Sequence, residues 1–198
     1  MDGLLDIKRS VVVVVDVQGK LVGMVHRPKL VLESIKRLLR VADIFGVPVV
    51  LTEQYPEGLG PTAAEIREVF DGLTVPKRHV SKTSFGCCGE PTFVRALAEM
   101  LPGIEPAERQ VILAGIEAHV CVQQTAIELL NRGEQIYLCW ECISGRGEEY
   151  RRHALDRMQQ AGARLTNHET VAFEWARSNE HPKFKQLNRL LRDGQLTG

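Results

Sequence analysis

The feature that most restricts the fold of this chain is a run of five valines, Val11–Val15, followed at once by Asp16. A continuous β-branched run is typical of a strand that is buried on both faces, as the inner strands of a parallel sheet are. Helices cover both faces of such a sheet, because each parallel connection crosses over one of them. The run therefore predicts an α/β domain in which this segment is an inner strand.

The rest of the chain alternates between strand-like and helix-like segments. Apolar residues recur at helical spacing, as at Leu32, Ile35 and Leu39, and short apolar runs lie between the helical segments. The predicted strands are residues 10–17, 47–51, 78–82, 110–114, 134–140 and 164–166, and the predicted helices are residues 28–45, 91–100, 119–131, 149–161 and 182–191, with a Gly- and Pro-rich loop at 55–61. Nothing marks a linker or a repeat. We therefore expect one domain over residues 1–198, with a six-stranded, mostly parallel sheet between two helical layers.

Composition narrows the class of partner. Basic and acidic residues balance at 25 each, whereas a nucleic-acid-binding domain usually carries a basic excess or a basic face. The valine run is far too short to span a bilayer, and the first ten residues mix charges with short apolar runs, unlike a signal peptide. We expect a cytoplasmic protein without a nucleic-acid or membrane partner.

The chain has five cysteines, and an odd count without a secretion signal argues against a disulfide framework. Cys139 and Cys142 have the C-x-x-C spacing of redox and zinc motifs. A thioredoxin-like pair should open a helix, however, and a zinc site needs two further ligands. Cys87 and Cys88 are expected to be packing residues. The six histidines are scattered without ligand spacing, so no metal site and no cofactor are predicted.

Three reactive side chains follow predicted strands, and ligands of α/β proteins bind beyond the carboxyl ends of the strands. Asp16 ends the first strand, Lys82 ends the third, and Cys121 follows the fourth at the start of a helix. Each has an ordinary alternative: a structural ion pair for Asp16, a surface position for Lys82 and a buried apolar role for Cys121. Because a helix N-terminus favours an anion, the position of Cys121 predicts a lowered thiol pKa.

These residues stand in the segments VVVVVDVQGKL, VPVVLTEQYPEGLG, SKTSFGCC and GIEAHVCVQQTA, and with them the chain resembles the isochorismatase-like cysteine hydrolase superfamily. The resemblance implies a Rossmann-like fold with strand order 3-2-1-4-5-6 and a catalytic triad of Asp16, Lys82 and Cys121. It also implies a cis peptide at Ile116–Glu117, with the backbone N–H groups of Glu117 and Cys121 forming an oxyanion hole. A homo-oligomer is a further implication.

The resemblance implies hydrolysis of a small amide, imide or ureido compound through a thioester on Cys121. Nicotinamidases of this superfamily carry an aspartate–histidine metal site, but residues 52–56 read TEQYP here and hold no histidine. True isochorismatases cleave a vinyl ether, a reaction that the resemblance suggests does not depend on the cysteine. We expect the substrate pocket to be lined by Gln18, Gln54, Tyr55, Phe85 and His119.

Three alternatives stay open on the sequence. The chain could be a non-catalytic scaffold of the same fold, a true isochorismatase, or a thiol redox sensor in which Cys121 pairs with Cys87 or Cys88. The last needs two sulfurs within disulfide reach, with Cα atoms roughly 4.4–6.8 Å apart.

Overall fold

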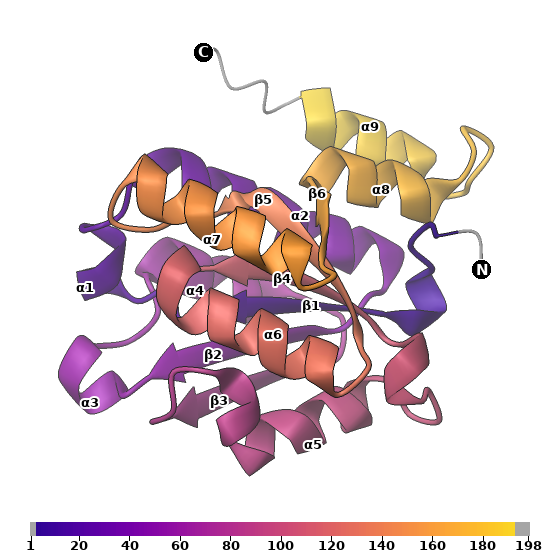
Figure 1. The fold of residues 1–198 in the computed structure, drawn as a ribbon. Helices are drawn as coiled ribbons and strands as arrows, with labels where there is room; N and C mark the ends of the chain where they lie inside the picture. Colours follow the sequence, from indigo (N-terminus) through magenta and orange to yellow (C-terminus); the bar gives the residue numbers. More distant parts are fainter. Residues whose placement is uncertain (1–2, 193–198) are drawn as a thin grey trace.

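Six strands form one parallel sheet at the centre of the molecule (Figure 1). The computed structural model describes residues 3–192. The strands are β1 (Ser10–Val15), β2 (Val49–Gln54), β3 (Lys77–Lys82), β4 (Gln110–Gly115), β5 (Gln135–Ile143) and β6 (Arg164–Thr166). Their order is β3-β2-β1-β4-β5-β6, and every neighbouring pair is parallel. The predicted α/β class and strand order are confirmed.

The valine run lies at the centre of this sheet, as the sequence predicts. All six residues of β1 are buried, and the strand pairs with β2 on one side and β4 on the other. Val12 and Val14 belong to one apolar core, and Val11, Val13 and Val15 to the other. The run is apolar throughout because helices cover both faces.

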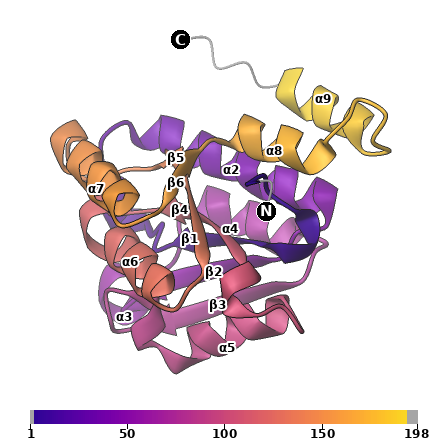
Figure 2. The same cartoon turned by 45° about the vertical axis from the view of Figure 1, so that its right-hand side comes forward.

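Figures 1 and 2 show these two helical layers. Side chains of α2 (Pro28–Phe45), α4 (Ala64–Gly72), α8 (His168–Ala176) and α9 (Phe184–Arg192) join the first core, and those of α5 (Pro91–Met100), α6 (Gln123–Asn131) and α7 (Glu148–Gln160) the second. The short helices α1 (Gly19–Val22) and α3 (Pro56–Leu59) lie at the carboxyl edge of the sheet (Figure 1). In the described part of the chain, no helix has the length and apolar character needed to cross a membrane.

Two helices of nine residues, α4 and α8, were absent from the sequence prediction, as was the single-turn helix α1. The short helix α4 buries only Ile66 and Phe70, so its apolar signal is brief. The helix α8 buries Val171, Ala172, Trp175 and Ala176 but has little contrast between its faces, since it packs between α2 and α9. The predicted loop at 55–61 also contains the single-turn helix α3.

The predicted ends of β2 and β5 were also wrong. β2 continues to Gln54 and β5 to Ile143. Leu113 pairs with Leu138, but two residues later Gly115 pairs with Ile143, so β5 contains a bulge of three extra residues opposite the end of β4. Bulges of this kind redirect side chains and are common near active sites.

Gly115 is required at the end of β4, where this strand pairs with Val15 of β1. Its φ is +127°, and a Cβ there would lie 2.1 Å from the backbone oxygen of Val15. We expect Gly115→Ala to lower the free energy of unfolding by about 3 kcal/mol or more, measured by urea denaturation. Gly72→Ala is the matched control, because Gly72 ends α4 and a Cβ added to it would meet open space, with nothing within 4 Å. Equal effects of the two substitutions would contradict this view of Gly115.

Candidate active site

The carboxyl ends of β1, β2 and β3 and the segment after β4 bring the three predicted reactive residues together. Asp16 directly follows β1, and Lys82 is the last residue of β3. Cys121 lies in a π-helical turn, η4 (Ala118–Val122), which precedes α6. The predicted helix at 119–131 is therefore divided into two parts. Cys121 is on the first part, close to the sheet.

Lys82 and Asp16 form a fully buried ion pair. Lys82 Nζ lies 2.7 Å from Asp16 Oδ2, and neither side chain is exposed to solvent. Lys82 Nζ also donates to Gln54 Oε1 at 2.9 Å and approaches the carbonyl oxygens of Ser84 and Phe85 at 3.0 and 2.9 Å. Buried charges are retained at tolerable cost only when they are paired and hydrogen-bonded in this way.

The backbone of Asp16 adopts a conformation that few residues other than glycine accept. Its φ is +52°, in the left-handed region that aspartate tolerates better than most residues. The Thr52 hydroxyl donates to Asp16 Oδ1 at 2.7 Å, which leaves Oδ2 for Lys82. The carboxylate is thus fixed between β1, β2 and β3.

Cys121 contacts the same carboxylate. The residue is 5% exposed, and Asp16 lies near enough to its thiol to act on the pKa of that thiol. Burial raises the pKa of Cys121 well above its usual value, the negative charge of Asp16 raises it further, and Lys82 offsets only part of this shift. The lowered pKa predicted from the helix start is therefore wrong, because desolvation and the neighbouring carboxylate outweigh the helix N-terminus.

The segment between β4 and Cys121 contains the expected cis peptide at Ile116–Glu117. Ala118 N–H donates to Ser144 O at 2.7 Å, which ties this segment to the residues after β5. The Glu117 side chain is buried, with Arg146 Nε 2.9 Å from Oε1 and His119 Nε2 3.6 Å from Oε2. Within residues 3–192, the Glu117 backbone N–H has no hydrogen-bond acceptor.

Of the predicted pocket residues, Gln18 and Gln54 are buried, whereas Tyr55 and Phe85 are exposed to solvent. Gln54 accepts a hydrogen bond from Lys82 and is the last residue of β2. Gln18 donates to the carbonyls of Gln54 and Gly60 and accepts from Gln54 N–H, so its amide braces the backbone. Tyr55 and Phe85 are exposed, at 54% and 56%.

His119 stacks on Tyr150, with ring centroids 4.9 Å apart. Its Nδ1 is buried without a hydrogen-bond partner in the described structure. Sequence reasoning missed Thr52, which lies inside an apolar strand without a signal, and Arg146, whose contact with Glu117 depends on the bulge before it.

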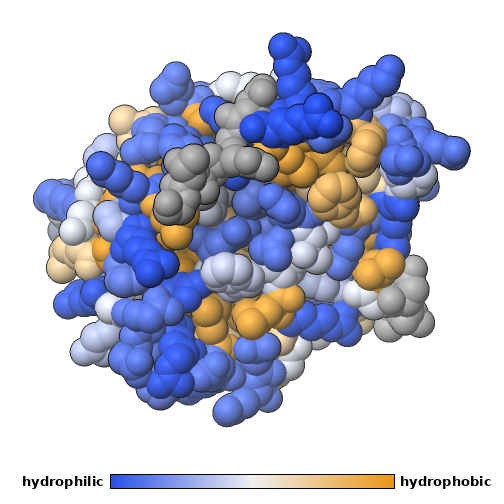
Figure 3. Space-filling view, turned by 90° about the horizontal axis from the view of Figure 1, so that it is seen from above, coloured by the Kyte–Doolittle hydropathy of each residue, from blue (hydrophilic) through white to orange (hydrophobic). Residues whose placement is uncertain are grey.

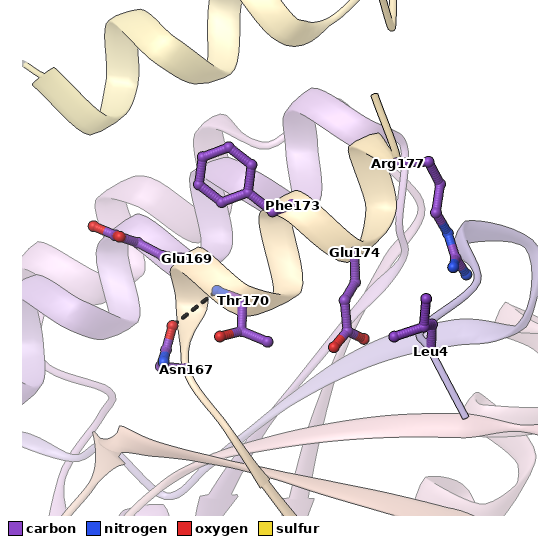
Figure 4. Close-up of a pocket in the computed structure, with 7 residues that line it drawn as sticks. All are labelled: Leu4, Asn167, Glu169, Thr170, Phe173, Glu174 and Arg177. Atoms are coloured by element: carbon purple, nitrogen blue, oxygen red, sulfur yellow. Dashed lines mark hydrogen bonds between the residues drawn. The ribbon is translucent and has the colours of Figure 1, made fainter. Parts of the chain in front are cut away.

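A surface depression elsewhere on the molecule is lined by none of the three predicted reactive residues. It has a volume of about 500 Å³ and is lined by Leu4 and residues at and around α8 (Figure 4). Leu4 precedes β1, so the depression lies at the amino edge of the sheet, away from Asp16, Lys82 and Cys121. Its lining contains neither a cysteine nor a histidine nor a lysine.

The face shown in Figure 3 is mostly hydrophilic, with smaller hydrophobic patches.

Comparisons with known proteins agree with this fold. The sequence model of the Isochorismatase domain matches residues 10–170. Isochorismatase domain-containing protein 1 of Salmo salar is 40% identical over 157 residues, which are 79% of this chain and 52% of the relative, so the match spans about half of that protein.

Two solved structures share the fold. A structure described as the MAR1 ribonuclease from Caenorhabditis elegans has a TM-score of 0.84 and 32% identity, covering 96% of this chain and 93% of that chain. The YcaC gene product from Escherichia coli, an octameric hydrolase of unknown specificity, has a TM-score of 0.80 at 24% identity, covering 98% and 97%, and this likeness shows the fold alone. On the domain match and these similarities, the chain belongs to the isochorismatase family, and its fold is that of the family's hydrolases.

Proposed function

We propose that this chain is a cysteine-dependent hydrolase that cleaves the C–N bond of a small amide, imide or ureido compound. The observation that carries the proposal is the contact of one buried carboxylate, Asp16, with both the Lys82 ammonium and the Cys121 thiol. A nucleophile beside a base, with the base itself oriented by a third group, is the general signature of covalent catalysis.

In the proposed first step, Asp16 accepts the Cys121 proton as sulfur attacks the substrate carbonyl carbon. The raised pKa of Cys121 keeps the resting residue a neutral thiol, so proton transfer must accompany attack. Lys82 stays charged and stabilises the negative charge that moves from Asp16 to the substrate oxygen. This charge arrangement requires no ionised thiol before the substrate binds.

The negative oxygen of the tetrahedral intermediate needs hydrogen-bond donors. We assign this role to the backbone N–H groups of Glu117 and Cys121, and the Glu117 N–H, which has no acceptor among residues 3–192, supports the assignment. One such donor typically contributes about 100–1,000-fold in rate.

Collapse of the intermediate breaks the C–N bond. Protonated Asp16 gives its proton to the leaving nitrogen, and the acyl group remains on Cys121 as a thioester. Asp16 then takes a proton from water as that water attacks the thioester carbonyl, which releases the carboxylic acid and returns the proton to Cys121. We further propose that the chain works in the cytoplasm and that it forms a homo-oligomer. The YcaC gene product from Escherichia coli, which shares the fold, is described as octameric.

The redox alternative fits the site less well. Burial raises the pKa of Cys87 to about 12, so neither Cys87 nor Cys121 is a ready thiolate at neutral pH. The scaffold alternative gives no reason for a buried ion pair in contact with a thiol, because replacing such pairs with apolar residues is often neutral or stabilising.

The proposal is tested by assaying wild type and Cys121→Ala on primary amides, cyclic imides and ureido compounds. Isochorismate and single-stranded RNA serve as substrates of other classes. We expect C–N hydrolysis by the wild type and a loss of about 10⁴-fold or more in Cys121→Ala. Cys88→Ala is the matched control, because Cys88 is only partly buried and lies beside Glu128. Vinyl ether cleavage that survives Cys121→Ala, RNA cleavage alone, or no turnover by the wild type would each contradict the proposal.

A further inference from the structure

The bulge in β5 places two cysteine sulfurs side by side. Residues three apart in a regular strand point to opposite faces of the sheet. Cys139 and Cys142 instead both enter the core beneath α2, because the extra residues of the bulge lie between them. Their Sγ atoms are 3.2 Å apart, and both residues are fully buried. The hydrolytic mechanism uses neither of them.

A carboxylate completes this cluster. Glu141 lies between the two cysteines in sequence, and its carboxylate oxygen and the two sulfurs all lie within 4.8 Å of one another. His168, the first residue of α8, holds Glu141 in place: its backbone N–H donates to Oε1 at 2.7 Å, and its Nδ1 contacts the same oxygen. His168 is itself buried, and in residues 3–192 its Nε2 has no partner.

We propose that Cys139, Glu141 and Cys142 form a binding site for a thiophilic divalent metal ion, with zinc as the best match. Two thiolates and a carboxylate are common zinc ligands, at about 2.3 Å for sulfur and 2.0–2.2 Å for oxygen. A tetrahedral ion at those distances holds its ligand atoms roughly 3.6–3.8 Å apart. The two sulfurs therefore need to separate by only about half an ångström from their 3.2 Å spacing.

Charge balance in the core agrees with the assignment. A Zn²⁺ ion that binds two thiols displaces their two protons, so the buried cluster keeps the same net charge with or without the metal. Glu141 adds one negative charge, and the nearby, largely buried Arg37 acts on Glu141 with one positive charge. The exchange thus leaves no unpaired charge in the core.

The site also has a route to solvent and a histidine that supports one of its ligands. Glu141 lines a cavity of about 550 Å³ between the start of α2 and the start of α7, from which water can complete a four-coordinate site.

A partner that orients a metal-bound carboxylate by hydrogen bonding is common in metal sites, and its loss typically weakens metal binding about 10–100-fold. His168 fits that positioning role. Directly after β5, the Ser144 carbonyl accepts from Ala118 N–H, so the metal would brace the strand end beside η4.

The test measures the binding of Co²⁺ and Zn²⁺ to the intact protein, which is purified in the presence of a reductant that contains no thiol. We expect one equivalent of Co²⁺ to produce a thiolate-to-cobalt charge-transfer band, and one equivalent of Zn²⁺ to abolish it. Cys139→Ser and Cys142→Ser should each lose the band, and Glu141→Gln and His168→Gln should weaken zinc binding about 10–100-fold in competition with a chelator. Cys88→Ser, which leaves the cluster intact, should bind like the wild type.

Each other outcome overturns the proposal. No band in the reduced wild type, or a band that survives both cysteine substitutions, would exclude a metal at this cluster. A Cys139–Cys142 disulfide found by non-reducing peptide mapping, with no metal bound after reduction, would make the pair a redox element instead. The wild-type spectrum and Glu141→Gln keep the test valid if a cysteine variant does not fold. None of these readouts depends on hydrolytic activity, so this proposal and the proposed function fail separately.

Discussion

Replacing Asp16 with asparagine is expected to reduce kcat/KM by about 10⁴-fold, at the upper end of what one general acid–base group contributes. Asparagine has nearly the same shape, but it can neither accept the Cys121 proton nor return a proton to the leaving nitrogen. The fold should survive, because Lys82 keeps the Gln54, Ser84 and Phe85 acceptors. The measurement is steady-state kinetics on whichever C–N substrate the wild type hydrolyses.

Asp71→Asn is the matched control for this prediction. Asp71 is exposed and forms an ion pair with Arg67 on the same helix, α4, so its loss should leave kcat/KM unchanged. If Asp16→Asn kept activity within about tenfold of the wild type, the general base would have to be another residue.

The second large effect is on stability. Lys82→Met is expected to lower the free energy of unfolding by about 3–5 kcal/mol, because it leaves the fully buried Asp16 carboxylate with the Thr52 hydroxyl but no cation. It also removes the donor from three oxygen acceptors around Nζ. Urea denaturation followed by circular dichroism measures this change.

Two further variants separate charge from packing. Lys29→Met removes an exposed lysine of α2 and should change stability by less than about 0.5 kcal/mol. The double variant Asp16→Asn/Lys82→Met should be more stable than Lys82→Met alone, because no unpaired charge remains in the core. A double variant that is less stable than Lys82→Met would show that Asp16 stabilises the fold without its partner.

The sequence was sufficient for the sheet and for the positions of Asp16 and Lys82 at the ends of their strands, because both depend on local patterns. The valine run predicts an inner parallel strand wherever it occurs, and a reactive residue just after a strand must lie at the carboxyl edge of the sheet. That edge is where Asp16 and Lys82 form their ion pair, although β2 separates their strands.

The missed features depend on contacts between distant segments. The bulge in β5 exists only relative to its pairing with β4, so no pattern within residues 135–143 marks where it begins. The pairing of Cys139 with Cys142, and the arrival of His168 at Glu141, follow from that bulge and from the packing of α8.

The direction of the Cys121 pKa shift could not be predicted for a related reason. The start of a helix lowers a thiol pKa only while solvent or a cation stabilises the thiolate. Here the residue is only 5% exposed, and the neighbour that contacts it is an anion.

The surroundings of Lys82 could not be predicted either. Two of its hydrogen-bond acceptors are the backbone carbonyls of Ser84 and Phe85, and no side-chain pattern specifies where those carbonyls lie.

The coupling of Asp16 to Cys121 is tested most directly by the pH dependence of Cys121 alkylation with iodoacetamide, quantified by peptide mass spectrometry in wild type, Asp16→Asn and Asp71→Asn. Because the pKa of Cys121 is raised, its wild-type rate should still be rising at about pH 10, past the ordinary thiol pKa of about 8.5. Asp16→Asn removes a negative charge that raises this pKa, so at about pH 8 the variant should react about tenfold faster although it no longer hydrolyses substrate. Asp71→Asn should match the wild type. Equal alkylation rates in wild type and Asp16→Asn across this pH range would show that the carboxylate does not act on the thiol, and would contradict the triad.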